Sequence, residues 1–534
     1  MKDLDILFIG AVMNYDGSTG SLANYIRKKG KWMAPFQYIY DQHRELFTSE
    51  ADACVYDIPN LSICELVDYL KRHGELEFHI IWHFDYHKEE ILEIFRTRPP
   101  KIIAVSSTLA FFPEYLKSCI HWLNTHKPAE TRVAVGGKWL YANFSQFGPS
   151  NKFEKTLTEV DADYYVINRY GQETLRLLLA AHKTGDTAAI RDLPNLAYRR
   201  SLDLGQPTTA THAGADYIIN PVITEAHEQG KYLVDFHNIG ERFLGDIVHV
   251  RTASSCPFHC RFCTFPALAG EYVAFGLDLV IAQLKQLKSL GVKKLFFIDD
   301  TFNVPLKRFE ELLDRMIAEN LELEWVSFFR AQYSTAEVVK KMRDAGCRMV
   351  FCGIESGNDE ILKAMNKRVT VADFERGFDF LHRAGITIAA SYFIGYPGET
   401  HQTAMDTLRL LNDPRIAFSR GSVFYYDPNA PVGAMAEEYG LSGNGAEWRH
   451  NTMSSREAAQ IHLEIVDKIQ NVNVQISDGA GWSVFHLYSK GLSIERLQTL
   501  YTEFNTIQKE QIQGAGRTAL SQYRVFGKKR KEEA

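Results

Sequence analysis

Cysteine is scarce in this chain of 534 residues. Eight cysteines are far fewer than a disulfide-stapled secreted domain carries, so a disulfide scaffold is excluded. No segment reaches the roughly 18 uninterrupted apolar residues of a membrane-spanning helix. Positive charge is not in excess either, because 60 Lys and Arg are set against 66 Asp and Glu, and nucleic acid is therefore not an expected partner. The first residues lack the basic start and long apolar core of a signal peptide, so we expect a cytoplasmic protein with no membrane partner.

Length and composition bound the architecture. A hydrophobic fraction of 45% and a charged fraction of 24% are those of a soluble globular protein, and the length predicts two or three domains. We expect a first domain over residues 1–185, a linker over 186–240, a second domain over 241–430 and a mostly helical region over 431–534.

Short apolar runs alternate with longer amphipathic stretches in the first domain. The runs over 4–9, 102–107 and 132–137 each predict a buried strand that ends in small residues. This alternation predicts an α/β fold, with a parallel sheet of the Rossmann-like or flavodoxin-like kind. Ligands of such sheets bind beyond the carboxyl ends of the strands. The candidate residues at that edge are Ser106, Ser107, Thr108, Gly136 and Gly137.

The second domain repeats a strand and a helix six times. Helical stretches such as 277–290 and 306–319 separate its apolar segments. Six repeats predict a partial (β/α)6 TIM barrel that stays open, because a closed barrel of this kind has eight. The predicted strands are 246–254, 293–299, 325–330, 348–355, 386–394 and 421–426.

Three cysteines follow the first strand of the second domain. Cys256, Cys260 and Cys263 have the spacing C-x3-C-x2-C, and such thiolates select iron–sulfur clusters, zinc or Cu(I). A structural zinc site needs four ligands, and His259 is the only nitrogen donor within the motif. Three thiolates on a [4Fe–4S] cluster leave one iron open to another ligand. The remaining cysteines are interpreted as ordinary buried residues: Cys54, Cys64, Cys119, Cys347 and Cys352.

The motif and its place after the first barrel strand resemble the signature of the radical S-adenosylmethionine (SAM) superfamily. The resemblance implies a [4Fe–4S] cluster on the three cysteines, SAM on the open iron, and an electron donor such as flavodoxin or ferredoxin. It also implies SAM contacts at strand ends: Asp300 toward the amino group, Arg330 and Glu355 toward the ribose or methionyl part, and the backbone at Gly395 along the adenine.

A parallel sheet before such a barrel resembles the cobalamin-binding domain of the B12-dependent (class B) branch of that superfamily. The resemblance brings Glu173, which follows Gly171-Gln172, to the corrin together with the five strand-end residues named above. The D-x-H-x-x-G motif of a lower axial histidine is absent, since Asp85-Tyr86-His87 continues with Lys88-Glu89-Glu90. A Rossmann-like domain for a nucleotide, or for no ligand, is the alternative.

Residues 251–258, 297–305 and 425–431 look like the subgroup that contains the phosphinate P-methyltransferase of phosphinothricin biosynthesis. This implies methyl transfer through methylcobalamin to an unactivated carbon or a phosphinate phosphorus of a small metabolite or peptide. A cyclase or rearrangement enzyme of the same branch, without methyl transfer, stays open, as does a zinc-bearing binding module that is not an enzyme. The sequence assigns no catalytic residue, and capping of the substrate site is one role open to the helical region after 431.

Overall fold

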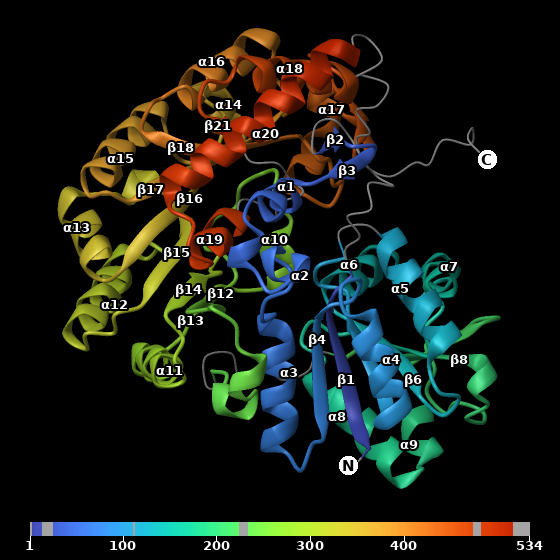
Figure 1. The fold of residues 1–534 in the computed structure, drawn as a ribbon. Coiled ribbons are helices and arrows are strands. Elements are labelled where there is room, and N and C mark those ends of the chain that lie inside the picture. The colour runs from blue at the N-terminus through green and yellow to red at the C-terminus, as the bar shows by residue number, and fades with distance from the viewer. Residues whose placement is uncertain (1–2, 13–24, 111–112, 224–232, 474–481, 516–534) are drawn as a thin grey trace. The chain divides into compact units, whose positions relative to one another are not determined.

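The computed structural model describes residues 3–12, 25–110, 113–223, 233–473 and 482–515 (Figure 1). The chain forms two compact units. The first unit contains Met1–Asn14 and Tyr56–Gly245, and the second contains Tyr15–Val55 and Asp246–Ala534. Among the described residues, no helix combines the length and the apolar character needed to cross a bilayer.

The first unit is built on a sheet whose first five strands are parallel. Their spatial order places the first strand of the chain between the second and the third, which is the flavodoxin-like order 2-1-3-4-5. This confirms the predicted α/β class. The strand order reverses between β1 and β5, and this position is the switch point of the sheet. In spatial order the strands are β4 (Phe78–His83), β1 (Leu4–Ala11), β5 (Pro100–Ser106), β6 (Arg132–Gly136) and β7 (Tyr164–Val166).

Helices cover this sheet. All eight residues of β1 are buried, as expected for a strand with helices on both faces. Leu7 and Ile9 project into a core shared with α4, α5, α6 and α7, whereas α3 and α8 contact each other. The helices of the unit are α3 (Leu61–Arg72), α4 (Lys88–Thr97), α5 (Pro113–His126), α6 (Lys138–Phe147), α7 (Asn151–Val160), α8 (Gln172–Thr184) and α9 (Thr187–Arg191).

Part of the linker predicted over 186–240 belongs to this sheet instead. The strands β8 (Leu196–Arg199), β10 (Tyr217–Ile219) and β9 (His212–Ala213) extend it beyond β7 in antiparallel fashion. The segments Leu196–Tyr198 and Tyr217–Ile219 are fully buried but too short to show a period in the sequence. The turn-forming residues between them mark a loop within the unit, and the sequence interpretation placed a domain connection there.

The second unit contains a sheet of seven parallel strands that does not close among the described residues. This confirms the open barrel. The strands are, in order, β11 (Ile247–Val250), β14 (Lys294–Phe297), β15 (Glu324–Phe329), β16 (Cys347–Glu355), β17 (Thr387–Ile394), β18 (Ile416–Val423) and β21 (Val472–Asn473). The sixth strand begins at Ile416, not at Gly421 as predicted, and β21 adds a short seventh strand from the helical region.

Helices line the outer side of this sheet, where Figure 1 shows α12, α13, α15 and α16. They are α11 (Leu277–Ser289), α12 (Leu306–Ala318), α13 (Ala336–Asp344), α14 (Asp359–Ala364), α15 (Val371–Arg383) and α16 (His401–Leu411). The region after 431 is mostly helical, with α17 (Ala436–Tyr439), α18 (Ser455–Lys468), α19 (Trp482–Ser489) and α20 (Ile494–Ala515). It also forms a hairpin of β19 (Ser442–Asn444) and β20 (Glu447–Arg449) that the sequence did not predict.

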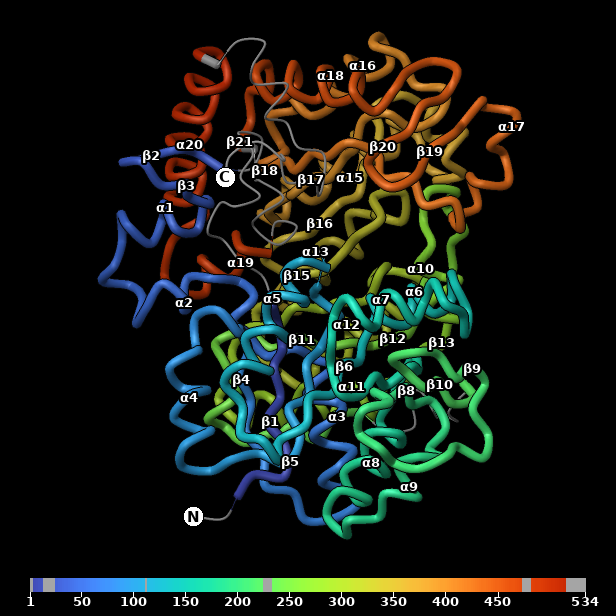
Figure 2. Tube along the Cα trace, turned by 90° about the vertical axis from the view of Figure 1, so that its right-hand side faces the viewer, coloured from blue at the N-terminus to red at the C-terminus, as the bar shows by residue number. Residues whose placement is uncertain are grey.

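Residues 25–55 belong to the second unit, although the sequence grouped them with the first domain. They form β2 (Ile26–Lys28), β3 (Lys31–Met33), α1 (Pro35–Gln42) and α2 (Glu50–Ala53). Figure 2 shows β2, β3 and α1 beside α20. The Tyr38 hydroxyl donates to Glu503 at 3.1 Å, and the Tyr38 and Phe504 rings lie edge to face with centroids 5.9 Å apart. These contacts fix the segment on the last helix.

Candidate active site

One face of the barrel strands is accessible toward their carboxyl ends. Successive side chains of a strand point to opposite faces, and here every second residue is partly exposed while its neighbours are buried. The partly exposed positions are Phe328, Arg330, Gly353, Glu355, Ser391, Phe393, Arg420 and Ser422. A parallel barrel carries its chemistry at this end.

Aromatic side chains close the amino-terminal half of the same face. The indole of Trp482, from α19, lies 5.1 Å from the Phe296 ring and 5.6 Å from the His249 ring, and Phe351 packs against Phe296 at 5.6 Å. Burial lowers the pKa of His249 to about 4. The imidazole is therefore neutral and forms part of an apolar floor.

The loop that carries Cys256, Cys260 and Cys263, here called the cysteine loop, begins at Thr252. The buried carboxylate of Asp299 holds this threonine. Both carboxylate oxygens of Asp299 accept the backbone N–H of Thr252 at 3.0 Å, and one also accepts its hydroxyl at 2.9 Å. Arg308 donates to the Thr252 carbonyl at 2.9 Å. Burial raises the pKa of Asp299 to about 6. Asp299 is a positioning residue that the sequence interpretation passed over in favour of its neighbour Asp300.

Asp300 and the three cysteines lie close enough to interact electrostatically. Burial raises the pKa of the Cys263 thiol to about 11, and the nearby Cys260, Cys256 and Asp300 add to this effect. Asp300 is exposed, and the hydroxyl of Thr301 lies 3.5 Å from the Cys256 sulfur. The structure therefore brings the predicted SAM-binding carboxylate to the predicted cluster ligands.

The turn after α14 fastens the cysteine loop from the other side. The backbone N–H of Arg261 donates to the Met365 carbonyl at 2.9 Å, and its guanidinium donates to the Ala364 carbonyl at 3.0 Å. Asn366 donates to the His259 carbonyl at 2.9 Å. The loop is therefore held by bonds to residues about 100 positions further along the chain.

Arg330 contacts the cysteine motif directly. Its Nη2 donates to the Cys260 sulfur at 3.1 Å, and its Nη1 donates to the Lys367 carbonyl at 2.9 Å. The guanidinium carbon lies 3.6 Å from the centre of the Phe258 ring. Arg330 therefore reaches a predicted cluster ligand, whereas the sequence prediction assigned it to SAM.

Glu355 ends β16 in a left-handed backbone conformation with a φ of 60°. Its carboxylate accepts from the Lys367 ammonium at 2.8 Å, and both side chains are largely buried. A Cβ at Gly353 would come within 2.4 Å of the Glu355 carboxylate. Gly353 thus leaves room for this ion pair beside Phe262, whose ring centre lies 5.7 Å from the ammonium.

Gly395 is enclosed by protein. Its N–H donates to Glu399 at 2.5 Å, and its carbonyl contacts the His450 ring at 3.1 Å. Its φ is 103°, and a Cβ there would come within 2.4 Å of the Trp448 indole. Packing against the hairpin thus accounts for this glycine, and its role beside the adenine stays a prediction. Sequence reasoning assigned no role to Glu399 or His450.

In the first unit, the predicted corrin contacts gather in part. Both the N–H and the hydroxyl of Ser107 donate to the Gly136 carbonyl at 2.7 Å. The φ of Gly137 is 107°, and a Cβ there would come within 2.9 Å of the Thr108 backbone N. Ser106, next to them, accepts the Thr108 N–H at 3.3 Å. These residues form one cluster at the carboxyl ends of β5 and β6.

Two other residues of the first unit are engaged elsewhere. Glu173 accepts from Arg176 at 2.6 Å and from the Tyr69 hydroxyl at 2.8 Å, which ties it to α3 and its own helix. His87, the histidine of the incomplete motif, pairs with Asp57 at 3.0 Å and with Glu90 at 3.3 Å. These carboxylates raise the pKa of His87 to about 10, so the imidazole is protonated at neutral pH.

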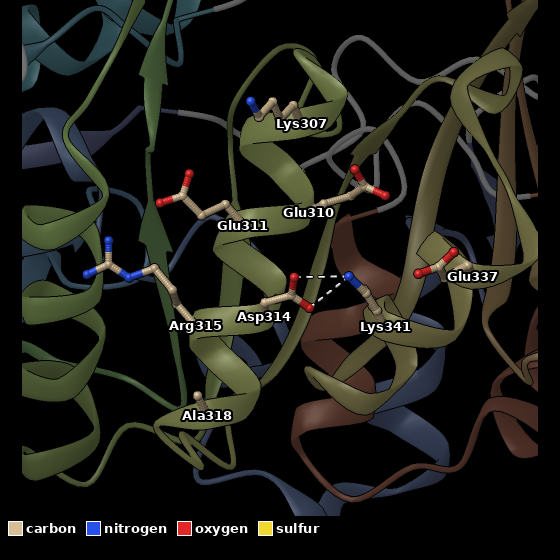
Figure 3. A pocket seen from close by; sticks show the side chains of 8 residues that line it. All are labelled: Lys307, Glu310, Glu311, Asp314, Arg315, Ala318, Glu337 and Lys341. Carbon is tan, nitrogen blue, oxygen red and sulfur yellow. Dashed lines mark hydrogen bonds and ion pairs between the residues drawn. The ribbon is translucent and has the colours of Figure 1, made fainter.

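A groove of about 780 Å³ lies on the outer helices α12 and α13 (Figure 3). Charged side chains of both signs line it, and Lys341 and Asp314 form an ion pair across it at 2.9 Å. None of the predicted site residues lies there.

Residues 250–411 match the model of the Radical SAM superfamily. An uncharacterized methyltransferase of Pyrococcus horikoshii is 28% identical over 208 residues, covering 38% of this chain and 44% of that protein. A bacteriochlorophyllide d C-12(1)-methyltransferase of Chlorobaculum tepidum is 28% identical over 191 residues, covering 35% and 41%. The chain thus spans less than half the length of these curated relatives.

Two solved structures share the fold over most of the chain. The radical SAM methyltransferase TsrM from Kitasatospora setae, with cobalamin and a [4Fe–4S] cluster bound, has a TM-score of 0.55 at 16% identity, covering 82% of this chain and 78% of that one. The cobalamin-dependent radical SAM enzyme OxsB, with aqua-cobalamin bound, has a TM-score of 0.55 at 12% identity, covering 97% and 81%. The protein shares the fold of these two enzymes.

Proposed function

We propose that this protein is a cobalamin-dependent radical SAM methyltransferase. The observation that carries the proposal is the cysteine loop, with Cys256, Cys260 and Cys263 at the carboxyl end of an open parallel barrel. A flavodoxin-like sheet precedes that barrel. The proposal is also supported by the fold shared with TsrM and OxsB, whose structures contain cobalamin. We infer a small metabolite or peptide as substrate, methylated at an unactivated carbon or a phosphinate phosphorus.

The residues of the loop suit a [4Fe–4S] cluster. A [4Fe–4S] cubane takes each thiolate on a different iron, and Cys256, Cys260 and Cys263 provide ligands for three of its four irons. Phe258 is buried beside Cys260 and Phe262 is half-buried beside Cys263, so both keep water from the site. When bound, the cluster and SAM supply one-electron chemistry and cobalamin supplies the methyl group.

The chain's own part is to bind and to orient. We propose Asp300 for the amino group of SAM, because it is an exposed carboxylate close enough to Cys263 to raise the pKa of that thiol. Glu355, held by Lys367, is proposed for the ribose or methionyl part. Ser391 and Ser422 lie on the accessible face further round the barrel, where the substrate would bind. Catalysis then depends on how rigidly these residues position the reactants.

For the corrin we propose the cluster of Ser106, Ser107, Thr108, Gly136 and Gly137. It lies at the carboxyl edge next to the switch point, where sheets of this order bind ligands. Glu173 stays a proposed corrin contact outside this cluster, because its carboxylate is already bonded to Arg176. The charged state of His87 does not suit a lower axial ligand, which must be neutral to bind cobalt. We also propose a cytoplasmic location and a low-potential donor such as flavodoxin or ferredoxin.

Anaerobic reconstitution tests the proposal. We expect a brown protein with roughly four irons per chain, production of deoxyadenosine, and a corrinoid spectrum once methylcobalamin is added. Alanine at Cys256, Cys260 or Cys263 should abolish the iron and the deoxyadenosine, while Cys352→Ala, a buried cysteine of β16, should keep both. One zinc per chain with no iron would refute the proposal in favour of the zinc-bearing module.

Methyl-labelled SAM separates methyl transfer from rearrangement. Label in the product supports the methyltransferase. Deoxyadenosine and corrinoid binding with unlabelled product would favour the cyclase or rearrangement enzyme.

A further inference from the structure

Arg330 donates a hydrogen bond to the sulfur of Cys260. The Nη2–sulfur distance of 3.1 Å is a charged hydrogen bond to one of the three proposed cluster ligands. The contact is the only one by which a cationic side chain donates to a motif sulfur among the described residues.

The arginine is held in place from several sides. Asn303, which is fully buried, donates to the Arg330 carbonyl at 2.9 Å and accepts its N–H at 3.0 Å. The second guanidinium nitrogen is fixed by the Lys367 carbonyl, and the planar group stacks on the Phe258 ring at 3.6 Å. A guanidinium so restrained loses little entropy when it donates to the sulfur.

We propose that Arg330 is a positioning residue that raises the reduction potential of the cluster. In the reduction, one electron passes from a low-potential donor to the cluster, whose net charge becomes more negative by one, and no bond breaks. Charge and hydrogen bonds at the sulfurs set such potentials, and a cation bonded to Cys260 stabilises the reduced state more than the oxidised one. The inference rests on the proposed function, and it differs from the SAM contact predicted for Arg330 because it places the guanidinium on a cysteine of the motif.

An EPR-monitored redox titration of the reconstituted protein tests the inference. The titration uses dithionite with mediators and omits SAM, so a cofactor contact of Arg330 cannot contribute. At the midpoint potential of the wild type we expect the ratio of reduced to oxidised cluster in Arg330→Met to fall about tenfold, which is about 59 mV for a one-electron couple. Arg330→Lys keeps the positive charge but loses the planar guanidinium that donates to two acceptors, so we expect a smaller fall in the ratio of reduced to oxidised cluster.

Arg376→Met is the matched control. Arg376 carries the same charge on α15, but it is exposed and its guanidinium pairs with Asp373 at 2.5 Å. We expect this control to change the ratio less than about twofold. Equal shifts in both methionine variants, or no shift in either, would overturn the inference.

The reduction potential of Arg330→Lys and the SAM affinity of Arg330→Met are measured as well. If Arg330→Met does not assemble a cluster, the lysine variant decides: a lower potential supports the inference, and an unchanged potential overturns it. Weaker SAM binding by Arg330→Met with an unchanged potential would make the residue a cofactor contact instead. A wild-type protein that assembles no cluster would defeat the proposed function itself, which is a distinguishable result.

Discussion

Glu399 gives the second unit a dependence on pH that a glutamine should remove. The side chain is fully buried, one oxygen accepts the Gly395 N–H, and the other has no hydrogen-bond partner among the described residues. Burial raises the pKa of Glu399 from 4.5 to about 8. The folded protein therefore keeps the proton over a range in which the unfolded chain releases it.

The sign and size of the effect follow from linkage. Because the folded pKa is raised, the stabilisation is complete below about pH 4.5 and is lost as the pH rises to about 8, with a total of up to about 5 kcal/mol. Glu399→Gln is neutral at every pH and should lose this decline.

Melting temperatures of the apoprotein between pH 5 and 9 measure the effect. We expect the advantage of Glu399→Gln over the wild type to grow with pH and to level off above about pH 8. Glu360→Gln, at an exposed glutamate of α14, is the control and should show no such trend. A difference between Glu399→Gln and the wild type that is constant with pH would refute the reasoning.

Three further predictions concern packing. Lys367→Met should destabilise the apoprotein by about 3 kcal/mol, because it leaves the Glu355 carboxylate buried without its cation; a milder effect of the double variant with Glu355→Gln in urea unfolding is the check. Gly395→Ala should cost about 3 kcal/mol through its φ and the Trp448 clash, and less in a Trp448→Ala background, as thermal melting would show. Gly137→Ala should cost about 2 kcal/mol and weaken corrinoid binding, measured by equilibrium dialysis.

Periodicity and strand-end chemistry predicted the fold where elements are long. The barrel strands and the parallel strands β1, β5 and β6 mostly follow apolar runs that the sequence shows clearly. Short elements escaped: β8 and β10 have three or four residues each, and the hairpin of β19 and β20 contains Gly443 and Gly445, which indicate turns rather than strands. Residues 25–55 could not be assigned from sequence, because contacts with α19, with α20 and with Lys490 between them place the segment.

The site was predictable where a residue's own chemistry identifies it. Three thiolates in one loop indicate cluster ligands at sequence level. Asp300 acts electrostatically on Cys263, and its contact with SAM stays a prediction. Asp299, Glu399 and Asn303 carry no such signal. Their roles depend on which backbone group lies opposite, and that is set by the register of neighbouring strands and loops.

The three cysteines alone do not define the geometry of the proposed cluster site. Residues far along the chain hold the cysteine loop. Asp299 accepts the N–H of Thr252, Asn366 donates to the His259 carbonyl, and the Met365 carbonyl accepts the N–H of Arg261. Each satisfies a backbone group that would otherwise be unpaired within the fold, at a cost of about 1–3 kcal/mol per group. The geometry of the three sulfurs is therefore fixed by the second strand of the barrel and by the turn after α14, and it follows that substitutions in those two places should impair cluster binding without touching a cysteine.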